Sequence, residues 1–572
     1  MMIRPAQDVE DYAWRRRGTL IIMVGAMVML IGRAIDLQVL NKQFLQQQGN
    51  QRHVAVVSVP AYRGKILDRN GEPLAISSPV QTVGVDRKNF KADEESLRKL
   101  AALLAKPLSQ VRKAVSAANG PRFLYLKRQV DPALANRIKN LQMSGIYFER
   151  EFRRFYPAGE VTAHLLGFTD IEDQGQEGIE SAYNKVLMAV AGEKRVIRDG
   201  NRDIIENVEN IRSPVPGRDV VLSIDQRLQY LAYRELKAAV IEHKARAGSL
   251  VMLDARTGEV LAVVNQPSLN PNSRKNRRPE RYRNRAITDV FEPGSTIKPF
   301  VIACALEAGM IRPDTVIDTR PGFFRVGRKR VRDIHNYGVI DITRILQKSS
   351  NVGVSKIALG LDPEVLWSFY RRLGFGVAVG TDFPSEASGS LSNYEDWSPF
   401  VQATLSYGYG LSSSSLHLAR AFSALANDGE MPSVSLLRRN QPPAFTRVMS
   451  AQTARIVKQM LETVVTREGT AYRARVAGYR VAGKTGTVKK ISGGGYSNDQ
   501  YLALFAGMAP ASDPRLVLLV VIDEPRGGAY YGGTVAAPVF ASVMSGALRL
   551  LGIAPDAEEN MPFVTARPGG TA

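Results

Sequence analysis

The chain has a single cysteine, Cys304, among its 572 residues. One thiol excludes an internal disulfide framework. Cys304 lies in the apolar run 300–306, which predicts a buried structural thiol rather than a catalytic one. Histidine is also scarce, because the five in the chain are scattered and show no Cys/His ligand spacing, so no metal site or cofactor is expected. We interpret His335 as a loop residue.

Signals for nucleic-acid binding are missing as well. Lysine and arginine number 76 against 55 aspartates and glutamates, which gives a net charge of +21. This charge is spread over the whole chain, and no basic region is interleaved with stacking aromatics. Nucleic acid is therefore not expected as a partner. The excess of positive charge suits an acidic membrane surface or an anionic polymer, and it suits a basic soluble surface equally well.

Long apolar runs are rare, and the clearest one, Gly18 to Gly32, follows Arg15-Arg16-Arg17. The run is short for a membrane span, but its ends can snorkel and the apolar pattern continues to Leu40. A cleaved signal peptide is the alternative, although no convincing small-x-small cleavage site precedes Gln43. We expect an uncleaved anchor over 18–40. Positive charge before the span places residues 1–17 in the cytoplasm.

Three short motifs occur in order along the rest of the chain: Ser295-Thr-Ile-Lys298, Ser349-Ser-Asn351 and Lys484-Thr-Gly486. A serine hydroxyl is a weak nucleophile until a nearby base takes its proton, and a desolvated or charge-crowded lysine can be that base. If Pro293-Gly294 opens a helix, Ser295 and Lys298 share one helix face within hydrogen-bond reach. The three motifs together predict a serine acyl-transfer site.

Each motif alone is weak, since Ser96-Leu-Arg-Lys99 and Ser268-Leu-Asn270 fit two of the same patterns. Ser96 lies in a charged stretch typical of a solvated helix face. Ser268 lies among prolines and asparagines, a composition typical of a turn. We interpret both as chance matches. The prediction of an acyl-transfer site depends on the ordered set of motifs at 295, 349 and 484.

The ordered triple resembles that of the penicillin-binding protein and serine β-lactamase superfamily. The flanking residues 289–300 and 348–358 resemble those of class B penicillin-binding proteins, and of the division-specific FtsI type in particular. Residues 63–71, 154–159 and 163–167 resemble the N-terminal module of that class. The resemblance covers most of the chain, from about Gln38 to Gly552.

This resemblance implies an α/β protein with one N-terminal transmembrane helix, an elongated α+β pedestal module and a C-terminal transpeptidase domain. In that domain an antiparallel sheet is flanked by helices and accompanied by an all-helical subdomain. The expected division is a cytoplasmic segment 1–17, an anchor 18–40, a dimerisation or pedestal domain 41–216, a transpeptidase domain 217–555 and a flexible tail 556–572. Residues 213–217, Ser-Pro-Val-Pro-Gly, read as the linker between the two domains.

Hydrophobic patterning predicts individual elements within these domains. Strands are expected over 54–60, 249–254, 259–264, 501–508 and 516–522, with a further strand starting at Lys484. Helices are expected over 95–104, 132–141 and 536–551.

The resemblance also assigns catalytic roles. Ser295 is the nucleophile and Lys298 the base that takes its proton. Ser349 relays a proton to the leaving amine, Asn351 holds the substrate amide, and Lys484 lends positive charge to the network.

Further positions contact substrate by the same resemblance. The hydroxyl of Thr487 holds the substrate carboxylate, and backbone N–H groups of Ser295 and Thr487 form an oxyanion hole. Thr485 stands where division-type members often carry serine, and Gly486 completes the motif. Tyr407 and Tyr531 are candidates for aromatic walls, with ordinary core packing as the alternative.

The implied function is peptidoglycan D,D-transpeptidation in septal wall synthesis through a Ser295 acyl-enzyme, without a cofactor. Partners would be stem peptides as donor and acceptor, β-lactams bound covalently at Ser295, and an FtsW-type glycan polymerase with other division proteins. The protein would sit in a bacterial inner membrane by one helix, with its catalytic domain in the periplasm. A D,D-carboxypeptidase or β-lactam hydrolase with the same site, and a specialised division paralogue or scaffold, stay open as alternatives.

Overall fold

The computed structural model describes residues 13–42, 54–116, 120–198, 204–273, 278–492 and 495–557. Contacts divide the chain into two compact units, and neither is one continuous stretch. The first unit comprises residues 1–61, 79–152 and 189–216, and the second comprises 62–78, 153–188 and 217–572.

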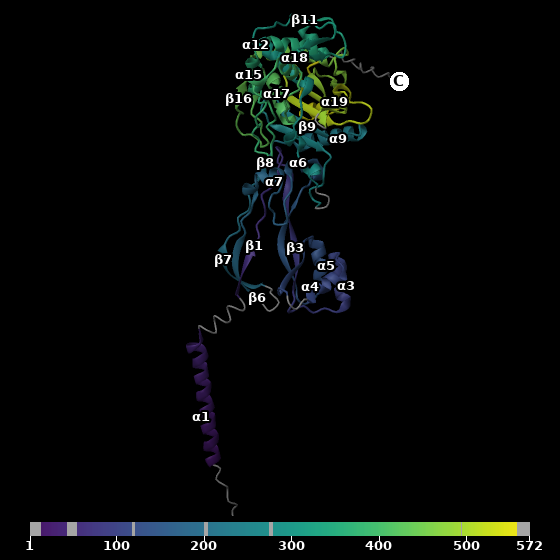
Figure 1. Ribbon diagram of the computed structural model, residues 1–572. Coiled ribbons are helices and arrows are strands. Elements are labelled where there is room, and N and C mark those ends of the chain that lie inside the picture. Colours follow the sequence, from purple (N-terminus) through teal and green to yellow (C-terminus); the bar gives the residue numbers. More distant parts are fainter. Residues whose placement is uncertain are drawn as a thin grey trace, which may run out of the picture. The chain divides into compact units, whose positions relative to one another are not determined.

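The first unit contains the apolar helix α1 (Ala13–Ile35), which continues as one π-helical stretch over Asp36–Leu40 (Figure 1). The most apolar window of the segment Trp14–Leu40 has a mean hydropathy of 2.1, and none of that window is buried. It is long and apolar enough to cross a membrane. Residues 1–12, most of the expected cytoplasmic segment, lie outside the described residues.

A three-stranded antiparallel sheet in the first unit has the order β1-β6-β7. Its strands are β1 (Val54–Val59), β6 (Gly192–Arg198) and β7 (Ile204–Arg212). The predicted strand at 54–60 is therefore confirmed. β1 pairs with β6 although more than a hundred residues separate them in sequence. The residues between them include 62–78 and 153–188, which belong to the second unit, so the first unit is discontinuous in sequence.

Three helices pack on a second sheet region of the first unit. This region contains the strands β3 (Pro73–Asp86), β4 (Phe123–Val130) and β5 (Ile146–Phe155) and the helices α3 (Glu94–Leu104), α4 (Leu108–Ser116) and α5 (Pro132–Lys139). Only residues 79 onward of β3 and residues up to 152 of β5 belong to the first unit. The helix α3 begins where the Asp93 carboxylate accepts a hydrogen bond from Ser96 N. It buries Leu97, Leu100 and Leu104, whose spacing of three and four residues places them on one face.

The second unit is built on a five-stranded antiparallel sheet with the order β10-β9-β19-β18-β17. The strands are β9 (Ala247–Asp254), β10 (Val260–Gln266), β17 (Ala482–Ser492), β18 (Gly495–Ala509) and β19 (Leu516–Asp523). β9, β10 and β19 are buried at nearly every position rather than at alternate ones. Both faces of the sheet must therefore be covered, which explains their continuous apolar sequences.

Helices supply that cover. α9 (Gln226–Glu242) and α19 (Gly532–Leu550) contact each other and the sheet (Figure 1). α17 (Ser415–Ala426) and α11 (Arg285–Thr288) form a second contacting pair on the sheet. α19 is also long and apolar enough to span a membrane, but half of its most apolar window is buried, as in a core helix. The predicted strands and the predicted helix at 536–551 are confirmed, with somewhat longer bounds.

A helical region follows the first motif. Its elements are α12 (Lys298–Glu307), α13 (Ile342–Lys348), α14 (Asn351–Gly360), α15 (Pro363–Arg372), a 3₁₀ turn (Tyr394–Asp396), α16 (Pro399–Leu405) and α18 (Ala451–Val464). The region also carries small two-stranded sheets: β11 (Val316–Asp318) with β14 (Val339–Asp341), β12 (Phe323–Val326) with β13 (Lys329–Arg332), and β15 (Glu430–Pro432) with β16 (Phe445–Arg447). The expected subdomain is thus helical with short hairpins inserted.

Residues from the expected N-terminal module contribute to the second unit. These include β2 (Ile66–Leu67), which pairs in parallel with β8 (Val220–Val221), and the short helices α6 (Ala163–Leu166), α7 (Gly178–Ala182) and α8 (Asn184–Leu187). Here the buried Glu180 carboxylate pairs with Arg63 at 2.7 Å and with Arg154 at 2.6 Å. Both arginines are buried, so the three side chains form one desolvated ion cluster.

Candidate active site

The first motif stands at the start of a helix, as its sequence predicts. Gly294–Ile297 forms one 3₁₀ turn, and α12 continues directly from Lys298. Ser295 is half-buried, whereas Lys298 is fully buried. The Lys298 ammonium donates to the backbone oxygen of Ser349 at 2.5 Å, to Ser349 Oγ at 3.1 Å and to Asn351 Oδ1 at 2.7 Å. It makes no hydrogen bond to Ser295 among the described contacts, so the expected serine–lysine contact is not formed in this state.

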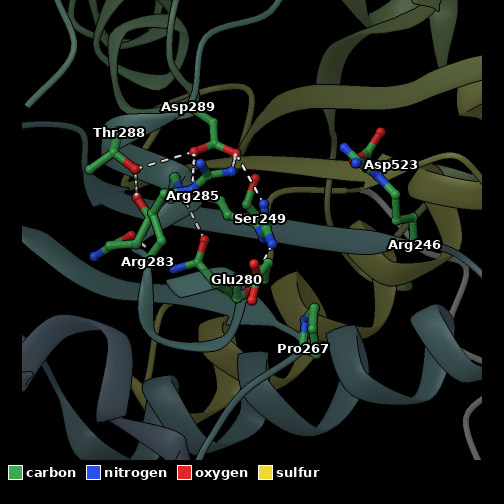
Figure 2. A network of polar contacts seen from close by, with 12 residues as sticks. Arg246, Ser249, Pro267, Glu280, Arg283, Arg285, Thr288, Asp289 and Asp523 are labelled. Atoms are coloured by element: carbon green, nitrogen blue, oxygen red, sulfur yellow. Dashed lines mark hydrogen bonds and ion pairs between the residues drawn. The ribbon is translucent and has the colours of Figure 1, made fainter. Parts of the chain in front are cut away.

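A polar network fixes the chain just before the nucleophile. Figure 2 shows two arginines converging on the Asp289 carboxylate. Arg283 reaches it at 2.9 Å and Arg285 at 3.2 Å, while the Thr288 hydroxyl donates to it at 3.2 Å. Phe291 then exchanges two backbone hydrogen bonds with Ser413. These contacts fix the segment 289–291, which precedes Ser295, through the Asp289 side chain and through the backbone of Phe291.

Gly408 and Gly294 bring two loops into direct backbone contact next to Ser295. Gly294 N donates to Gly408 O at 3.1 Å. A Cβ on Gly408 would lie 2.2 Å from Gly294 O, and Gly408 has φ +85°, so only glycine fits there. The position of the nucleophile therefore depends on the loop after α16.

The second motif forms a corner between two helices. α13 ends at Lys348 and is capped by Ser349, a non-glycine residue in the left-handed region with φ 60°. α14 begins at Asn351, and the Ser350 hydroxyl caps it by accepting from Gly353 N. Backbone strain at a non-glycine residue persists only where its surroundings impose it. The corner turns Ser349 and Asn351 toward Lys298.

Asp333, which the sequence analysis did not identify, holds this corner in place. Its carboxylate accepts from the Ser350 hydroxyl at 2.5 Å and from the backbone nitrogens of Asn351 and Val352. Asp333 directly follows the β12–β13 hairpin, which is inserted between the first and second motifs. No local pattern marks it, because its partners lie about 17 residues further along the chain.

The third motif lies on β17, which is one of the two edge strands of the sheet. Lys484 is fully buried, and its ammonium donates to Ser349 Oγ at 2.9 Å. The Thr485 hydroxyl bonds instead to that of Thr470 at 2.9 Å, while the Thr487 hydroxyl accepts from Gly532 N at 3.0 Å. The structure therefore joins the third motif to the second through Ser349.

Gly486 allows β17 to approach the 3₁₀ turn that carries Ser295. A Cβ on Gly486 would lie 3.1 Å from Thr296 Cγ2 and 3.3 Å from Pro293 O. Any larger side chain would push on the segment that holds the nucleophile. Close packing therefore requires glycine at this position of the third motif.

Electrostatics favour neutral lysines in this site. Burial lowers the pKa of Lys298 well below its ordinary value; the nearby Lys484 charge lowers it further, and Asp333 opposes the shift. Burial lowers the pKa of Lys484 to about 7. Two buried ammonium groups that share the Ser349 hydroxyl resist being charged together, so one neutral lysine is available near neutral pH.

Tyrosines surround the motifs. Tyr407 is half-buried, and burial raises its pKa to about 12. Its ring meets that of Tyr409 edge-on at 5.8 Å, and Tyr409 meets Tyr496 at 5.2 Å. Tyr531 is 48% exposed and stacks on Tyr530 at 4.5 Å, directly before the Gly532 N–H that binds Thr487.

The remaining candidates behave as structural residues. Cys304 is buried in α12, and burial raises its pKa to about 12, so the thiolate nucleophile is disfavoured. His335 is exposed in a loop. Ser96 lies in the first turn of α3 and Ser268 donates to Glu160, in agreement with their interpretation as chance matches. Among the described residues no cluster of His, Cys, Asp and Glu could hold a metal ion.

Comparison with known proteins agrees with this geometry. The model of the penicillin binding protein transpeptidase domain matches residues 248–545, and that of the penicillin-binding protein dimerisation domain matches residues 58–222. The chain belongs to the penicillin-binding protein transpeptidase family.

Individual relatives match over nearly the whole chain. The peptidoglycan D,D-transpeptidase FtsI of Escherichia coli is 42% identical over 537 residues, which is 93% of this chain and 91% of that protein. The probable peptidoglycan D,D-transpeptidase PenA of Neisseria gonorrhoeae is 42% identical over 540 residues, 94% of this chain and 92% of that protein. The solved transpeptidase domain of penicillin-binding protein 3 from Burkholderia pseudomallei is 43% identical with a TM-score of 0.55, and the match covers 59% of this chain and 98% of that domain.

Proposed function

We infer that this protein is a serine-type peptidoglycan D,D-transpeptidase that cross-links stem peptides in septal wall synthesis and is a target of β-lactams. The observation that carries this conclusion is the position of the Ser349 hydroxyl. It lies 3.1 Å from the Lys298 ammonium and 2.9 Å from that of Lys484. This arrangement joins the lysine of the first motif, the serine of the second and the lysine of the third in one hydrogen-bonded network.

Acylation comes first. Ser295 Oγ attacks the carbonyl carbon between the last two D-alanines of a donor stem, and neutral Lys298 takes the hydroxyl proton. Backbone N–H groups of Ser295 and Thr487 stabilise the oxyanion of the tetrahedral intermediate. The C–N bond then breaks. The leaving D-alanine amine takes a proton through Ser349, and an ester on Ser295 remains.

Transfer follows by the same groups in reverse. The amine of a neighbouring stem attacks the ester carbonyl and gives up a proton, which passes back to Ser295 Oγ as the ester C–O bond breaks. One amide bond is lost and one is formed, so the reaction needs neither ATP nor a cofactor. A β-lactam opens on Ser295 by the first half of this sequence.

Substrate contacts are assigned from the family resemblance. Asn351 holds the substrate amide, and its Oδ1 already lies 2.7 Å from the Lys298 ammonium. Thr487 binds the substrate carboxylate, while Thr485 and Gly486 keep β17 against the nucleophile segment. Tyr407 and Tyr531 form aromatic walls, supported by the partial exposure of both rings.

The chain is organised for a membrane-anchored enzyme. Residues 18–40 anchor it in the inner membrane as a single pass, and the three arginines before the span hold residues 1–17 in the cytoplasm. Residues 41–216 form the pedestal and 217–555 the periplasmic transpeptidase domain. The tail 556–572 lies largely outside the described residues. An FtsW-type glycan polymerase and other division proteins are the proposed partners, bound through the span and the pedestal.

Intact-mass spectrometry after exposure to benzylpenicillin tests this assignment. We expect one stable adduct that maps to Ser295 and is lost in Ser295→Ala. An adduct that disappears rapidly would favour the hydrolase. Absence of any adduct on the folded protein would remove Ser295 as the nucleophile and favour a scaffold.

A further inference from the structure

A basic hairpin, β12–β13, is inserted between the first and second motifs. Its strands pair in antiparallel register, so that Arg325 lies directly opposite Arg330 and Phe323 directly opposite Arg332. These four side chains share one face, because every second residue of a strand points the same way. Arg328 lies in the turn between the strands, and no acidic residue occurs between positions 320 and 332. We call this set of four arginines and one phenylalanine the basic face.

The opposite face of the hairpin is packed against the protein. Val326 and Val331 are buried in a small apolar cluster with Val352 of α14, and Phe324 packs against that cluster. All members of the basic face are exposed instead. The hairpin is therefore amphipathic, and its basic face is directed to solvent.

The arginines of the basic face have no counter-charge of their own. Within the described part of the chain, none of their side chains forms a hydrogen bond or an ion pair. The carboxylates nearest in sequence are engaged elsewhere, since Asp318 pairs with Arg320 at 2.8 Å and Asp333 accepts from the second motif. Like charges directly opposite each other on two strands are destabilising. The pairing of Arg325 with Arg330 therefore has a cost that a bound anion would offset.

The basic face is oriented and fixed beside the second motif. The Arg330 guanidinium lies over the Phe323 ring at 4.4 Å. A guanidinium held by its flat face keeps the N–H donors of its edge free, and these match the two oxygens of a carboxylate. At the other end of the row, the backbone oxygen of Arg332 accepts from Asn351 Nδ2 at 3.1 Å.

We propose that the basic face binds the carboxylates of peptidoglycan stem peptides and thereby holds a neighbouring glycan chain beside the Ser295 cleft. The identity of this partner rests on the proposed function. Stem peptides carry a C-terminal carboxylate and further free carboxylates along the peptide, and many stems project from one chain. A row of arginines can therefore contact several of them at once. No bond is made or broken at this face, which raises the local concentration of substrate by charge attraction.

Binding of soluble peptidoglycan chains to the full-length protein in detergent micelles tests the proposal. The labelled chains carry tripeptide stems, which lack D-alanyl-D-alanine and cannot be donors, and their fluorescence anisotropy reports the affinity. We expect Arg325→Gln/Arg330→Gln to bind at least tenfold more weakly than wild type. Arg438→Gln/Arg549→Gln is the matched control, because it removes two exposed arginines from other parts of the second unit and should keep the wild-type affinity.

The same measurement is repeated after treatment with benzylpenicillin. Acylation of Ser295 should leave the affinity for tripeptide chains unchanged, since the basic face lies outside the cleft. The comparison between wild type and variants stands whether or not an adduct forms. A missing adduct would therefore count against the proposed function and not against the basic face.

Amidating the stem carboxylates tests the chemistry of recognition. We expect amidated chains to bind wild type at least tenfold more weakly than unmodified chains do. Thermal unfolding separates lost binding from lost folding, because Arg325→Gln/Arg330→Gln relieves a like-charge pair and should unfold at or above the wild-type temperature. Arg328→Gln is a second variant, which lies in the turn and leaves the strand pairing intact, and it should also weaken binding.

Three results would overturn the proposal. The first is equal affinity of wild type and Arg325→Gln/Arg330→Gln, as expected if the charges only keep the hairpin from pairing with other chains. The second is equal binding of amidated and unmodified chains. The third is arginine-dependent binding of phosphatidylglycerol vesicles without binding of the chains, which would identify the partner as a membrane surface.

Discussion

Replacing Asp333 by asparagine tests how the second motif is held. The Asp333 carboxylate accepts from the Ser350 hydroxyl with one oxygen and from Asn351 N and Val352 N with the other. In Asp333→Asn the amide oxygen can keep both backbone contacts, but the NH₂ group then faces the Ser350 hydroxyl. That hydroxyl already accepts from Gly353 N at 2.9 Å, so its proton loses its acceptor. One unmade hydrogen bond costs about 1–3 kcal/mol of unfolding free energy.

The same substitution changes the pH dependence of acylation. Burial and Lys484 lower the pKa of Lys298, and Asp333 raises it. Removing the Asp333 charge therefore lowers the pKa of Lys298 further. Lys298 is the base only when it is neutral, so the acid limb of the acylation profile should move to lower pH. Stopped-flow measurement of the second-order rate with a chromogenic β-lactam across the pH range of the folded protein reports this shift.

Asp341→Asn is the matched control. Asp341 caps α13 by accepting from Arg344 N at 2.7 Å, and asparagine caps helices equally well. We expect the control to keep both the wild-type stability and the wild-type acid limb. If the acid limb of Asp333→Asn coincides with that of wild type or moves to higher pH, then the field of Asp333 does not act on Lys298 and the reasoning fails.

Three further predictions address other parts of the second unit. Glu180→Gln leaves two buried guanidinium groups with only the nearby Asp173 carboxylate to oppose their charge. It should lower the unfolding free energy by about 3–5 kcal/mol in urea, and a loss below about 1 kcal/mol would contradict the buried cluster. Gly408→Ala should displace Gly294 and thereby slow penicillin acylation about tenfold or more. Gly410→Ala is the control, because Gly410 has a similar φ of +90° but its added Cβ would have its nearest atom at 3.6 Å, so acylation should keep its wild-type rate. Equal acylation rates for the two variants would refute the role of the Gly408–Gly294 contact. Burial raises the pKa of Asp173 to about 6. The protonated side chain therefore favours the folded state at low pH, and this stabilisation is lost as the pH rises through 6. Asp173→Asn should therefore gain up to about 3 kcal/mol over wild type above pH 6 and nothing below about pH 4 in urea unfolding, and a pH-independent difference would count against it.

The sequence predicted the parts of this fold that depend on local pattern. Apolar runs at 249–254 and 516–522 predicted strands because their side chains are buried on both faces of the sheet. The expected start of β18 at Tyr501 fell short, since the strand begins at Gly495 and its first residues are polar and exposed. A polar strand that projects from the core has no hydrophobic signal to detect.

The parts that were missed depend on contacts between distant residues. Spacing placed Ser295 and Lys298 near each other, but it could not show that Lys298 binds Ser349 and Asn351, more than 50 residues away. Asp333 was missed for the same reason. The contribution of residues 62–78 and 153–188 to the second unit was also not predicted, because an apolar pattern shows which residues are buried and not which core buries them.

Incubation of the full-length protein with a pentapeptide stem that ends in D-alanyl-D-alanine, together with an excess of an amine-bearing acceptor stem, tests the central claim most directly. Mass spectrometry of the products distinguishes transfer from hydrolysis. The account predicts release of one D-alanine for each new donor–acceptor amide, with both products lost in Ser295→Ala and in a sample first acylated by benzylpenicillin. Release of D-alanine with only the shortened donor stem would show that water is the acceptor and would contradict transpeptidation.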